Sequence, residues 1–593
     1  MKSEKYIKGT NLSFVTTFIL FLSILHLLFF MPHADAGNEK TIALVMKALS
    51  NPFFSKMEEG ARKYAKAEKI PLEVFGVERE TDVERQIGIC ENLISRGYGA
   101  IVIAPADSKK LVPICKKAME KNIIVINIDN PLHPETMKQL GISIPFVGSD
   151  NRIGAGMVGQ YIKDKLAGQG QIIVIEGIRG VENAELRKKG FIETVTQDSS
   201  IQIVSSESAN WHTDEALSVT TELLKKNKAV DAIFCANDQM ALGALQAIDI
   251  MGLSGTVLLA GYDNIESARD EMRNGRIQAT IEQHPELMGE YGVELARKAL
   301  NGQKIPSYKS TPLDLITHES FNKIIALSVS NLKNSFFSTL LKGAQQAADL
   351  YGSKLVFKDA QDSDSQQLTD IAHLLTKNID VLIVNPTNTE SVMPGIEMAN
   401  KKNIPVITVD RKASGGKILC HIESDNVEGG RMAARILVQH FKGDVKVVEI
   451  EGIPGTSACY ERGVGFNEEL QKHTRIKVVA RDVANFDRKE AQEVMQRIMQ
   501  NFKDFDAVFA HNDNMILGVI DALKKSKDQR QPVLIGFDAI RDAKEAVLQG
   551  QLTATIAQKP EIMGKLSIET AVRYFRGQEI KPTLFVDLSV ITK

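Results

Sequence analysis

The chain carries the same long pattern twice. NPFFSKMEEGA begins at Asn51 and NSFFSTLLKGA begins at Asn334, each directly after an apolar run typical of a β-strand. The register then holds over a whole domain, because polar residues of the first pattern recur 275 positions later: Arg187, Asn237, Asp263 and Gln283 return as Arg462, Asn512, Asp538 and Gln558. A period this long indicates duplicated domains rather than a solenoid of short repeats.

The two copies account for most of the chain. We expect a first copy over residues 37–319 and a second copy over residues 322–593, joined by a linker of only a few residues. A chain of 593 residues is too long for one hydrophobic core, and at about 150 residues per folding unit it predicts roughly four units. Each copy is therefore expected to hold two folding units.

Apolar, β-branched runs alternate with amphipathic helical segments in each copy. In the first copy the runs are TIALVM, LEVFGV, AIVIAP and IIVINID, followed by QIIVIEG, IQIVSS, AIFCAND and VLLAGYD. Near-continuous Val, Ile and Leu between helices is typical of parallel sheets covered on both faces. The predicted fold class is α/β, with each copy made of two doubly wound parallel-sheet lobes.

The N-terminus has the order of a secretory signal. Lysines precede an apolar run over residues 14–31, and the small-residue triplet Ala34-Asp35-Ala36 follows it. We predict a signal peptide over residues 1–36, cleaved after Ala36, and a mature protein in the periplasm of a Gram-negative cell. An uncleaved membrane anchor is the alternative, because the run is close to the length that spans a bilayer.

Charge and cysteine content exclude several classes of function. A formal net charge of -2 leaves no basic surface for nucleic acid, so no DNA or RNA partner is expected. The five cysteines are odd in number and scattered through apolar segments, which indicates buried thiols rather than a disulfide framework. They lack Cys-x-x-Cys spacing and neighbouring histidine pairs, so we expect neither a metal site nor a cofactor.

In the second copy, polar side chains follow the ends of several predicted strands. Ligands of open parallel sheets lie in the crevice beyond the carboxyl ends of the strands. Any one of these residues could instead cap a helix, since Asn and Asp are common N-caps, but several strand ends in step favour a binding site. The candidates are Asn334, which starts the first helix, and Asn385, Asp410, Arg411, Asn512, Asp538 and Gln558.

Aromatic residues stand beside these polar groups, at Phe336, Phe337, Phe486 and Phe537. A sugar ring has apolar C–H faces and a belt of hydroxyl groups. It therefore fits flat aromatic rings above and below, with charged or amide groups around its rim. A role as core filler is the alternative for any single Phe. Together with the polar strand ends, the pattern predicts a carbohydrate site.

The second copy resembles the type I periplasmic solute-binding proteins and, over its full length, the D-ribose-binding family. The resemblance is carried by stretches such as IALSVSNLKNSFF, VLIVNPTN, IPVITVDRKA, GIPGTSACYERGVGF, AVFAHNDNMILG and ATIAQKP. In that family a pentose is held by residue types that all recur here. The resemblance implies a ligand site of Asn334, Phe336, Phe337, Asn385, Asp410, Arg411, Arg462, Phe486, Asn512, Phe537, Asp538 and Gln558.

The first copy resembles the same family but departs from it inside the site. It keeps Asn51, Phe53, Phe54, Asp129, Arg187, Asn237, Asp263 and Gln283. Four positions differ, namely Ala104 for Asn385, Asn130 for Arg411, Trp211 for Phe486 and Tyr262 for Phe537, and Lys47 ends the first strand. Losing a guanidinium and gaining a broader ring changes the hydroxyl pattern that fits, so a different sugar or polyol is expected. Lys47 either contacts that ligand or is a solvated loop lysine.

The resemblance also implies a mechanism. Two lobes joined by three crossing segments hinge open when empty and close on the ligand, because only the closed state lets both lobes contact it. In the family an ABC-type permease recognises the closed form, and in some members a chemoreceptor does so as well. We therefore expect a monomeric binding component of an ABC sugar importer. A ligand-binding subunit of a chemoreceptor or membrane sensor kinase system is the alternative.

An enzyme is not expected. GAGMVG at Gly154 fits the dinucleotide pattern G-x-G-x-x-G, but it lies within a predicted helix, and the second copy reads GGRMAA there. The sequence shows no nucleophile–base pair. A sugar-responsive transcription factor would need a helix-turn-helix before the first lobe, where this chain has a secretion signal instead.

Overall fold

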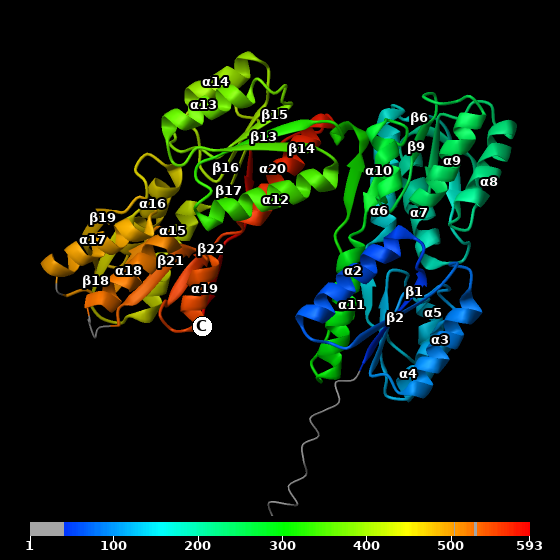
Figure 1. Cartoon of the computed structure of the whole chain (residues 1–593), viewed down its shortest axis with the longest axis horizontal. Coiled ribbons are helices and arrows are strands. Elements are labelled where there is room, and N and C mark those ends of the chain that lie inside the picture. Colours follow the sequence, from blue (N-terminus) through cyan, green and yellow to red (C-terminus); the bar gives the residue numbers. More distant parts are fainter. Residues whose placement is uncertain (1–40, 503, 527–530) are drawn as a thin grey trace, which may run out of the picture. The chain divides into compact units, whose positions relative to one another are not determined.

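The computed structural model describes residues 41–502, 504–526 and 531–593 (Figure 1). The predicted signal peptide lies outside these described residues. The described chain forms two compact units, one ending at Ile265 and resuming over Ile281–Leu315, the other made of Glu266–Thr280 and Ile316–Lys593. It contains four six-stranded sheets, two in each copy, which confirms the predicted tandem of two-lobed α/β domains.

The first copy has one sheet per lobe. The sheet of its first lobe has the order β11-β5-β4-β3-β1-β2, and the sheet of its second lobe has the order β12-β10-β9-β8-β6-β7. Neighbouring strands such as β1 and β3 run parallel, as predicted. The strands are β1 (Ile42–Ala48), β2 (Leu72–Val77), β3 (Ala100–Ile103), β4 (Ile124–Ile128), β5 (Phe146–Gly148), β6 (Gln169–Glu176), β7 (Ser200–Ser208), β8 (Ala232–Cys235), β9 (Leu258–Ala260), β10 (Ala279–Glu282), β11 (Tyr308–Ser310) and β12 (Asp314–Thr317).

The second copy repeats this topology. Its first-lobe sheet has the order β14-β13-β15-β16-β17-β23, and its second-lobe sheet has the order β19-β18-β20-β21-β22-β24, in which β22 and β24 pair antiparallel. The strands are β13 (Ile324–Val329), β14 (Lys354–Asp359), β15 (Val381–Val384), β16 (Val406–Val409), β17 (Cys420–Glu423), β18 (Val445–Glu451), β19 (Ile476–Val483), β20 (Ala507–Ala510), β21 (Val533–Asp538), β22 (Ala554–Ala557), β23 (Thr583–Phe585) and β24 (Ser589–Thr592).

Helices alternate with the strands in both copies. Those of the first copy are α2 (Pro52–Ala67), α3 (Val83–Arg96), α4 (Val112–Glu120), α5 (Pro134–Gln139), α6 (Asn151–Lys165), α7 (Glu182–Thr196), α8 (Thr213–Lys226), α9 (Asp238–Ile250), α10 (Glu266–Arg273) and α11 (Pro285–Leu300). After the short 3-10 turn η1 (His318–Ser320), those of the second copy are α12 (Ser335–Tyr351), α13 (Asp364–Leu374), α14 (Met393–Lys401), α15 (Asn426–His440), α16 (Ser457–Gln471), α17 (Arg488–Asn501), α18 (Asp513–Ser526), α19 (Arg541–Leu548) and α20 (Pro560–Phe575).

The chain crosses between the lobes of each copy three times. In the first copy it passes from β5 to α6, returns from β10 to α11, and crosses again from β11 to β12. The second copy repeats these crossings from β17 to α15, from β22 to α20 and from β23 to β24. Strand ends of both lobes therefore face one cleft in each copy, with the three crossings as its hinge.

Close helix packing fixes the helix that begins each site. In the second copy α12 and α20 approach at Gly343 and Gly564, where a Cβ would lie 2.1 Å from Glu561 O and 2.0 Å from Leu340 O. Only glycine fits at such a distance. The first copy has the same contact between α2 and α11, at Gly60 and Gly289, so the first helix of each copy is packed closely against the helix that follows the second crossing.

Candidate ligand-binding sites

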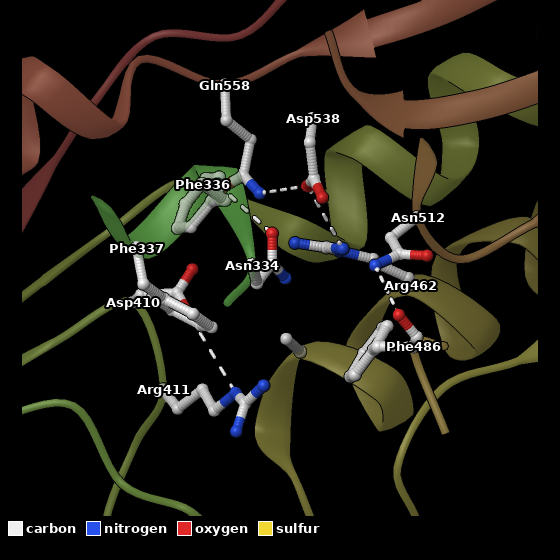
Figure 2. Close-up of a pocket in the computed structure, with 11 residues that line it drawn as sticks. Asn334, Phe336, Phe337, Asp410, Arg411, Arg462, Phe486, Asn512, Asp538 and Gln558 are labelled. Carbon is white, nitrogen blue, oxygen red and sulfur yellow. Dashed lines mark hydrogen bonds and ion pairs between the residues drawn. The ribbon is translucent and has the colours of Figure 1, made fainter. Parts of the chain in front are cut away.

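A cavity of about 260 Å³ lies between the two lobes of the second copy (Figure 2). Its walls come from the start of α12, the residues after β16, the first turns of α16, and the strand ends of the second lobe. Gln558 enters from the crossing after β22. The lining residues are Asn334, Phe336, Phe337, Asp410, Arg411, Ala458, Arg462, Phe486, Asn512, Asp538 and Gln558.

Aromatic rings flank this cavity. Figure 2 shows Phe336 and Phe337 on one side and Phe486 on the other. The Phe336 and Phe337 rings stand nearly perpendicular, at 87° with 5.1 Å between their centroids. Phe486 has a φ of 59° and packs on Gly452, where a Cβ would lie 2.1 Å from the ring. The arrangement suits a flat ligand with apolar faces.

Asp410 and Arg411 form the polar wall of the first lobe. Asn385 lies behind them, because its Nδ2 donates to Asp410 Oδ2 at 3.3 Å and to Val409 O at 3.1 Å. Arg411 donates to Pro386 O at 3.2 Å, and its guanidinium lies 5.2 Å from the Phe337 ring centroid. Within the described chain, Arg411 Nε makes no hydrogen bond. Asn385 thus orients Asp410, and Arg411 keeps a donor for a ligand.

Arg462 organises the second lobe. Its guanidinium donates to Asn426 Oδ1 at 2.9 Å and His511 O at 2.6 Å, and lies 3.5 Å from Asp538 Oδ1. The Phe537 ring lies under it, with 3.9 Å between the Arg462 guanidinium carbon and the ring centroid. Phe537 therefore supports Arg462 and does not line the cavity.

Burial dominates the electrostatics of this site. Loss of water raises the pKa of Asp538 to about 6, although the nearby Arg462 opposes this shift. Burial likewise raises the pKa of Asp410 and lowers that of Arg411, with each partially offset by the other's charge. The cavity lining holds two carboxylates and two guanidinium groups, so its formal charges sum to zero. An uncharged ligand rich in hydroxyl groups matches it best.

Two of the candidates are helix caps and also line the cavity. Asn334 Oδ1 accepts the Phe336 N–H at 3.0 Å, and Asn512 Oδ1 accepts the Met515 N–H at 2.9 Å. Each cap uses the amide oxygen. The two interpretations of these residues are therefore compatible, since both capping side chains also line the cavity. Asn512 Nδ2 in addition donates to Phe486 O at 3.3 Å.

The first copy has an equivalent cavity of about 230 Å³ between its lobes. The helix start, the strand ends and the opposing arginine recur, but three of its lining residues are acidic. It is lined by Lys47, Asn51, Phe53, Phe54, Glu80, Asp129, Asn183, Arg187, Trp211, Asn237 and Asp263.

Lys47 is buried in this wall and is therefore not a solvated loop lysine. Its Nζ lies 3.1 Å from Asp129 Oδ2 and 3.3 Å from Glu80 Oε2. Burial acts to lower the pKa of Lys47, but the two carboxylates outweigh it, so the pKa is raised. A charged Lys47 thus supplies the cation of this first-lobe wall, which has Asn130 at the sequence position of Arg411.

Arg187 repeats the role of Arg462. It donates to Asn151 Oδ1 at 2.7 Å and to Asp263 Oδ1 at 3.3 Å, with the Tyr262 ring 3.9 Å below its guanidinium carbon. Gln283 lies one layer further out and donates to Asp263 Oδ1 at 2.7 Å. Tyr262 and Gln283 therefore position Arg187 and Asp263 and are not part of the cavity lining.

Asn130 points away from the cavity. Its Nδ2 donates to Pro105 O at 2.9 Å, and its Oδ1 accepts the Asn183 N–H of the opposite lobe at 3.2 Å. Ser108 Oγ accepts the Glu182 N–H at 3.0 Å in the same way. These two first-lobe side chains cap the N-terminus of α7 across the cleft, so they stabilise the closed arrangement.

The structure thus brings the predicted residues of each copy to one cleft, in two layers. Asn385, Phe537, Asn130, Tyr262 and Gln283 lie outside the lining, and Ala104 is buried in the core. Glu80, Asn183 and Ala458 also line the cavities but were not predicted from the sequence. Asn183 and Ala458 carried a signal, because they occupy equivalent positions 275 residues apart beside the two arginines.

A charged cluster lies at the hinge of the first copy. His284 Nε2 lies 2.7 Å from Asp314 Oδ2, and its Nδ1 lies 3.2 Å from Glu286 Oε1. The backbone N–H of His284 donates to Glu282 Oε1 at 2.7 Å. Burial lowers the pKa of His284, but hydrogen bonds to Asp314 and Glu286 outweigh it and raise that pKa to about 9. His284 bridges two crossing segments as a cation.

We expect this cation to make the stability of the first copy depend on pH. The folded pKa of about 9 exceeds the ordinary histidine pKa of 6.5, so the stabilisation is complete below about pH 6.5 and is lost as the pH rises through 9. It amounts to at most about 3 kcal/mol. Denaturation of the His284→Asn variant should show a flatter pH dependence over that window. His373→Asn, at an exposed position, is the control and should leave it unchanged.

In the part of the chain that the structure describes, no helix has both the length and the apolar character to cross a membrane.

One stretch of 269 residues is 41% identical to the ribose import binding protein of Haemophilus influenzae, covering 45% of this chain and 91% of that protein. A stretch of 291 residues is 40% identical to the D-ribose/D-allose-binding protein of Pseudomonas aeruginosa, covering 48% and 91%.

A solved structure is also similar. The crystal structure of an ABC transporter periplasmic solute binding protein from Actinobacillus succinogenes with bound D-allose matches with a TM-score of 0.46 and 37% identity, over 47% of this chain and 98% of that one. The family described as periplasmic binding protein domain matches residues 42–304 and again residues 325–579. The chain therefore belongs to the periplasmic binding protein domain family, and it carries that domain twice.

Proposed function

We propose that this protein is the periplasmic solute-binding component of an ABC sugar importer. The second copy would bind D-ribose or a close pentose, and the first copy a different sugar or polyol. One observation carries the proposal, namely that in each copy aromatic rings and buried charged or amide groups from two lobes face a single cavity. The names of the two relatives, which refer to ribose and allose, support the choice of ligand.

Binding would combine apolar and polar contacts. The Phe337 and Phe486 rings would cover the faces of the sugar, while Asp410, Arg411 and Asp538 would hydrogen-bond its hydroxyl groups. Hydrogen bonds to charged groups are worth about 1.5–3 kcal/mol each, and the costs of ordering and desolvation offset part of this. A dissociation constant near micromolar, about -8 kcal/mol, is the expected result.

Hinge closure would couple binding to recognition by a permease. The lobes of the second copy already contact each other, since the Lys412 N–H donates to Ser457 Oγ at 2.8 Å and the Thr389 N–H donates to Gly455 O at 3.0 Å. A ligand held by both lobes would favour this closed form over an open one. The permease, and in some systems a chemoreceptor, would then recognise the closed form.

The remaining features belong to the same proposal. The mature chain would begin after residue 36, and its binding domains would occupy residues 37–319 and 322–593. It would act as a monomer in the periplasm, without a cofactor, a nucleic-acid partner or catalytic turnover. Paired charges that hold each other in place suit recognition of a neutral polyol better than proton transfer.

Calorimetric titration of the purified full chain with D-ribose tests the proposal. We expect one ribose to bind per chain, with no change in the sugar after incubation. Titration with L-arabinose, D-xylose and xylitol would establish the preference of the second copy. Absence of heat with every sugar and polyol would contradict the proposed function.

The contact between Phe486 and Gly452 predicts a sensitive position. Gly452→Ala places a Cβ 2.1 Å from the Phe486 ring, so the ring must move into the cavity. Overpacking of this kind costs about 1–3 kcal/mol, and ribose affinity should fall by roughly 10- to 100-fold. Gly443→Ala is the matched control, because no atom lies within 4 Å of the added Cβ. Equal affinities for the two variants would contradict this role of Phe486.

A further inference from the structure

The two cavities differ along one wall of the second lobe. Asn183 and Trp211 line the first cavity at the positions where Ala458 and Phe486 line the second. The side chains of Asn183 and Trp211 are 3% and 4% exposed, respectively. The first cavity thus has two polar groups, an amide and an indole N–H, where the second presents a methyl group and a phenyl ring.

Neither polar group has a hydrogen-bonding partner in the part of the chain that the structure describes. Among the described residues, no group donates a hydrogen bond to Asn183 Oδ1, and none accepts one from Trp211 Nε1. Buried polar groups are nearly always hydrogen-bonded, because leaving them unpaired destabilises the fold. Two unpaired groups on one wall of a cavity, one acceptor and one donor, indicate a ligand that completes both.

The first-lobe residue that faces this wall also differs between the two copies, being Arg411 in the second and Asn130 in the first. In the second cavity the Arg411 guanidinium lies 5.6 Å from the Phe486 ring, and a guanidinium offers only donors. In the first cavity Asn130 replaces it and is bonded to Pro105 O and the Asn183 N–H, away from the ligand. Opposite Phe486, the second cavity therefore has the donors of Arg411, whereas the first cavity has no guanidinium from Asn130 there and instead has one acceptor, on Asn183, and one donor, on Trp211.

A hydroxyl group fits the first arrangement, because it donates one hydrogen bond and accepts others. An ether oxygen could accept from Trp211 but could not satisfy Asn183.

We infer that Asn183 and Trp211 form a subsite in the first copy that recognises one free hydroxyl group of a neutral sugar or polyol. This inference rests on the proposed function of the first copy. The subsite accepts a ligand with that hydroxyl and rejects its deoxy and O-methyl analogues, a distinction that the second copy does not make at this wall.

The chain itself supplies the reporter for a test. Its single Trp is Trp211, so tryptophan fluorescence of the full chain reports ligand binding in the first cavity and not in the second. The probes are D-glucose, D-galactose, D-allose and xylitol, followed by the monodeoxy derivatives of the tightest binder. Removing the recognised hydroxyl should weaken binding by about 100-fold or more, because it leaves buried polar groups unpaired.

Asn183→Ala, which copies the second cavity, identifies that hydroxyl. We expect this variant to bind the parent sugar more weakly and to reduce the penalty of one monodeoxy analogue to less than about tenfold. Trp211→Phe, followed by calorimetry, should act on the same position. Ribose binding in the second copy is the internal control and should not change.

Two results would overturn the inference. If every deoxy analogue loses the same affinity in Asn183→Ala as in the parent protein, Asn183 recognises no hydroxyl group. If deoxy analogues all bind as tightly as the parent sugar, the subsite does not exist, although sugar binding itself stands. A failure of all probes to change the fluorescence or heat would instead contradict the proposed function of the first copy, and with it the subsite.

Discussion

Arg411→Ala should weaken ribose binding in the second copy by at least about 100-fold, which corresponds to about 3 kcal/mol. Arg411 is 3% exposed, its guanidinium lies over the Phe337 ring, and its Nε has no hydrogen bond to any residue that the structure describes. Its removal deletes a charge-assisted donor and leaves the buried Asp410 without its neighbouring cation. Calorimetric titration of the full chain measures the loss directly.

Two further variants separate this effect from misfolding. Arg411→Lys keeps the charge but not the planar fork, so it should recover only part of the affinity. Arg435→Ala removes an arginine that is 45% exposed and paired with Glu428 on the surface of α15, and it should bind ribose normally. Unchanged heat from ribose with Arg411→Ala would show that the site is elsewhere.

Lys47→Met should destabilise the first copy by about 3–5 kcal/mol. The substitution keeps the length of the side chain but removes the cation that lies within 3.3 Å of both Glu80 and Asp129. Two buried carboxylates then face each other without a counter-ion, which costs more than the lost attraction alone. Denaturant unfolding followed by Trp211 fluorescence reports on this copy, since the chain has a single Trp.

Lys56→Met is the control, because Lys56 is 42% exposed and lies 4.0 Å from Glu282. A stability loss for Lys47→Met no larger than that for Lys56→Met would contradict the role assigned to the buried cluster.

The sequence alone was enough to predict that the binding site lies at the strand ends, because the geometry of parallel sheets determines where those ends lie. Parallel strands end at the same edge of a sheet, so Asp410, Asn512 and Asp538 had to converge wherever the lobes met. The duplication and the alternation of strands and helices likewise predicted four sheets, which the structure confirms. These features depend on topology alone.

The layer in which each residue lies could not be predicted in this way. Asn385 and Asp410 both follow strands, yet only Asp410 lines the cavity, because Asn385 hydrogen-bonds the neighbouring backbone. Phe537 lies beneath Arg462 because Gly429 leaves room for its ring, which would lie only 2.5 Å from a Cβ at that position. Such placements depend on tertiary packing between segments far apart in the chain.

Glu80 was missed for a related reason. It follows β2 in a loop rather than at a strand end that the pattern marks, and it reaches the site only because Lys47 lies opposite it. Asn183 lies in the first turn of α7, where polar residues are common for reasons unrelated to ligands. Its significance depends on the unpaired Oδ1, which only the structure reveals.

Hydrogen–deuterium exchange of the full chain with and without D-ribose tests the central claim most directly. A sugar held between two lobes should protect segments from both, namely the start of α12 and the residues after β16 in the first lobe, and the residues after β19 and β20 in the second. Residues 41–265 should show no change. Protection confined to one lobe, or appearing in the first copy, would contradict the account.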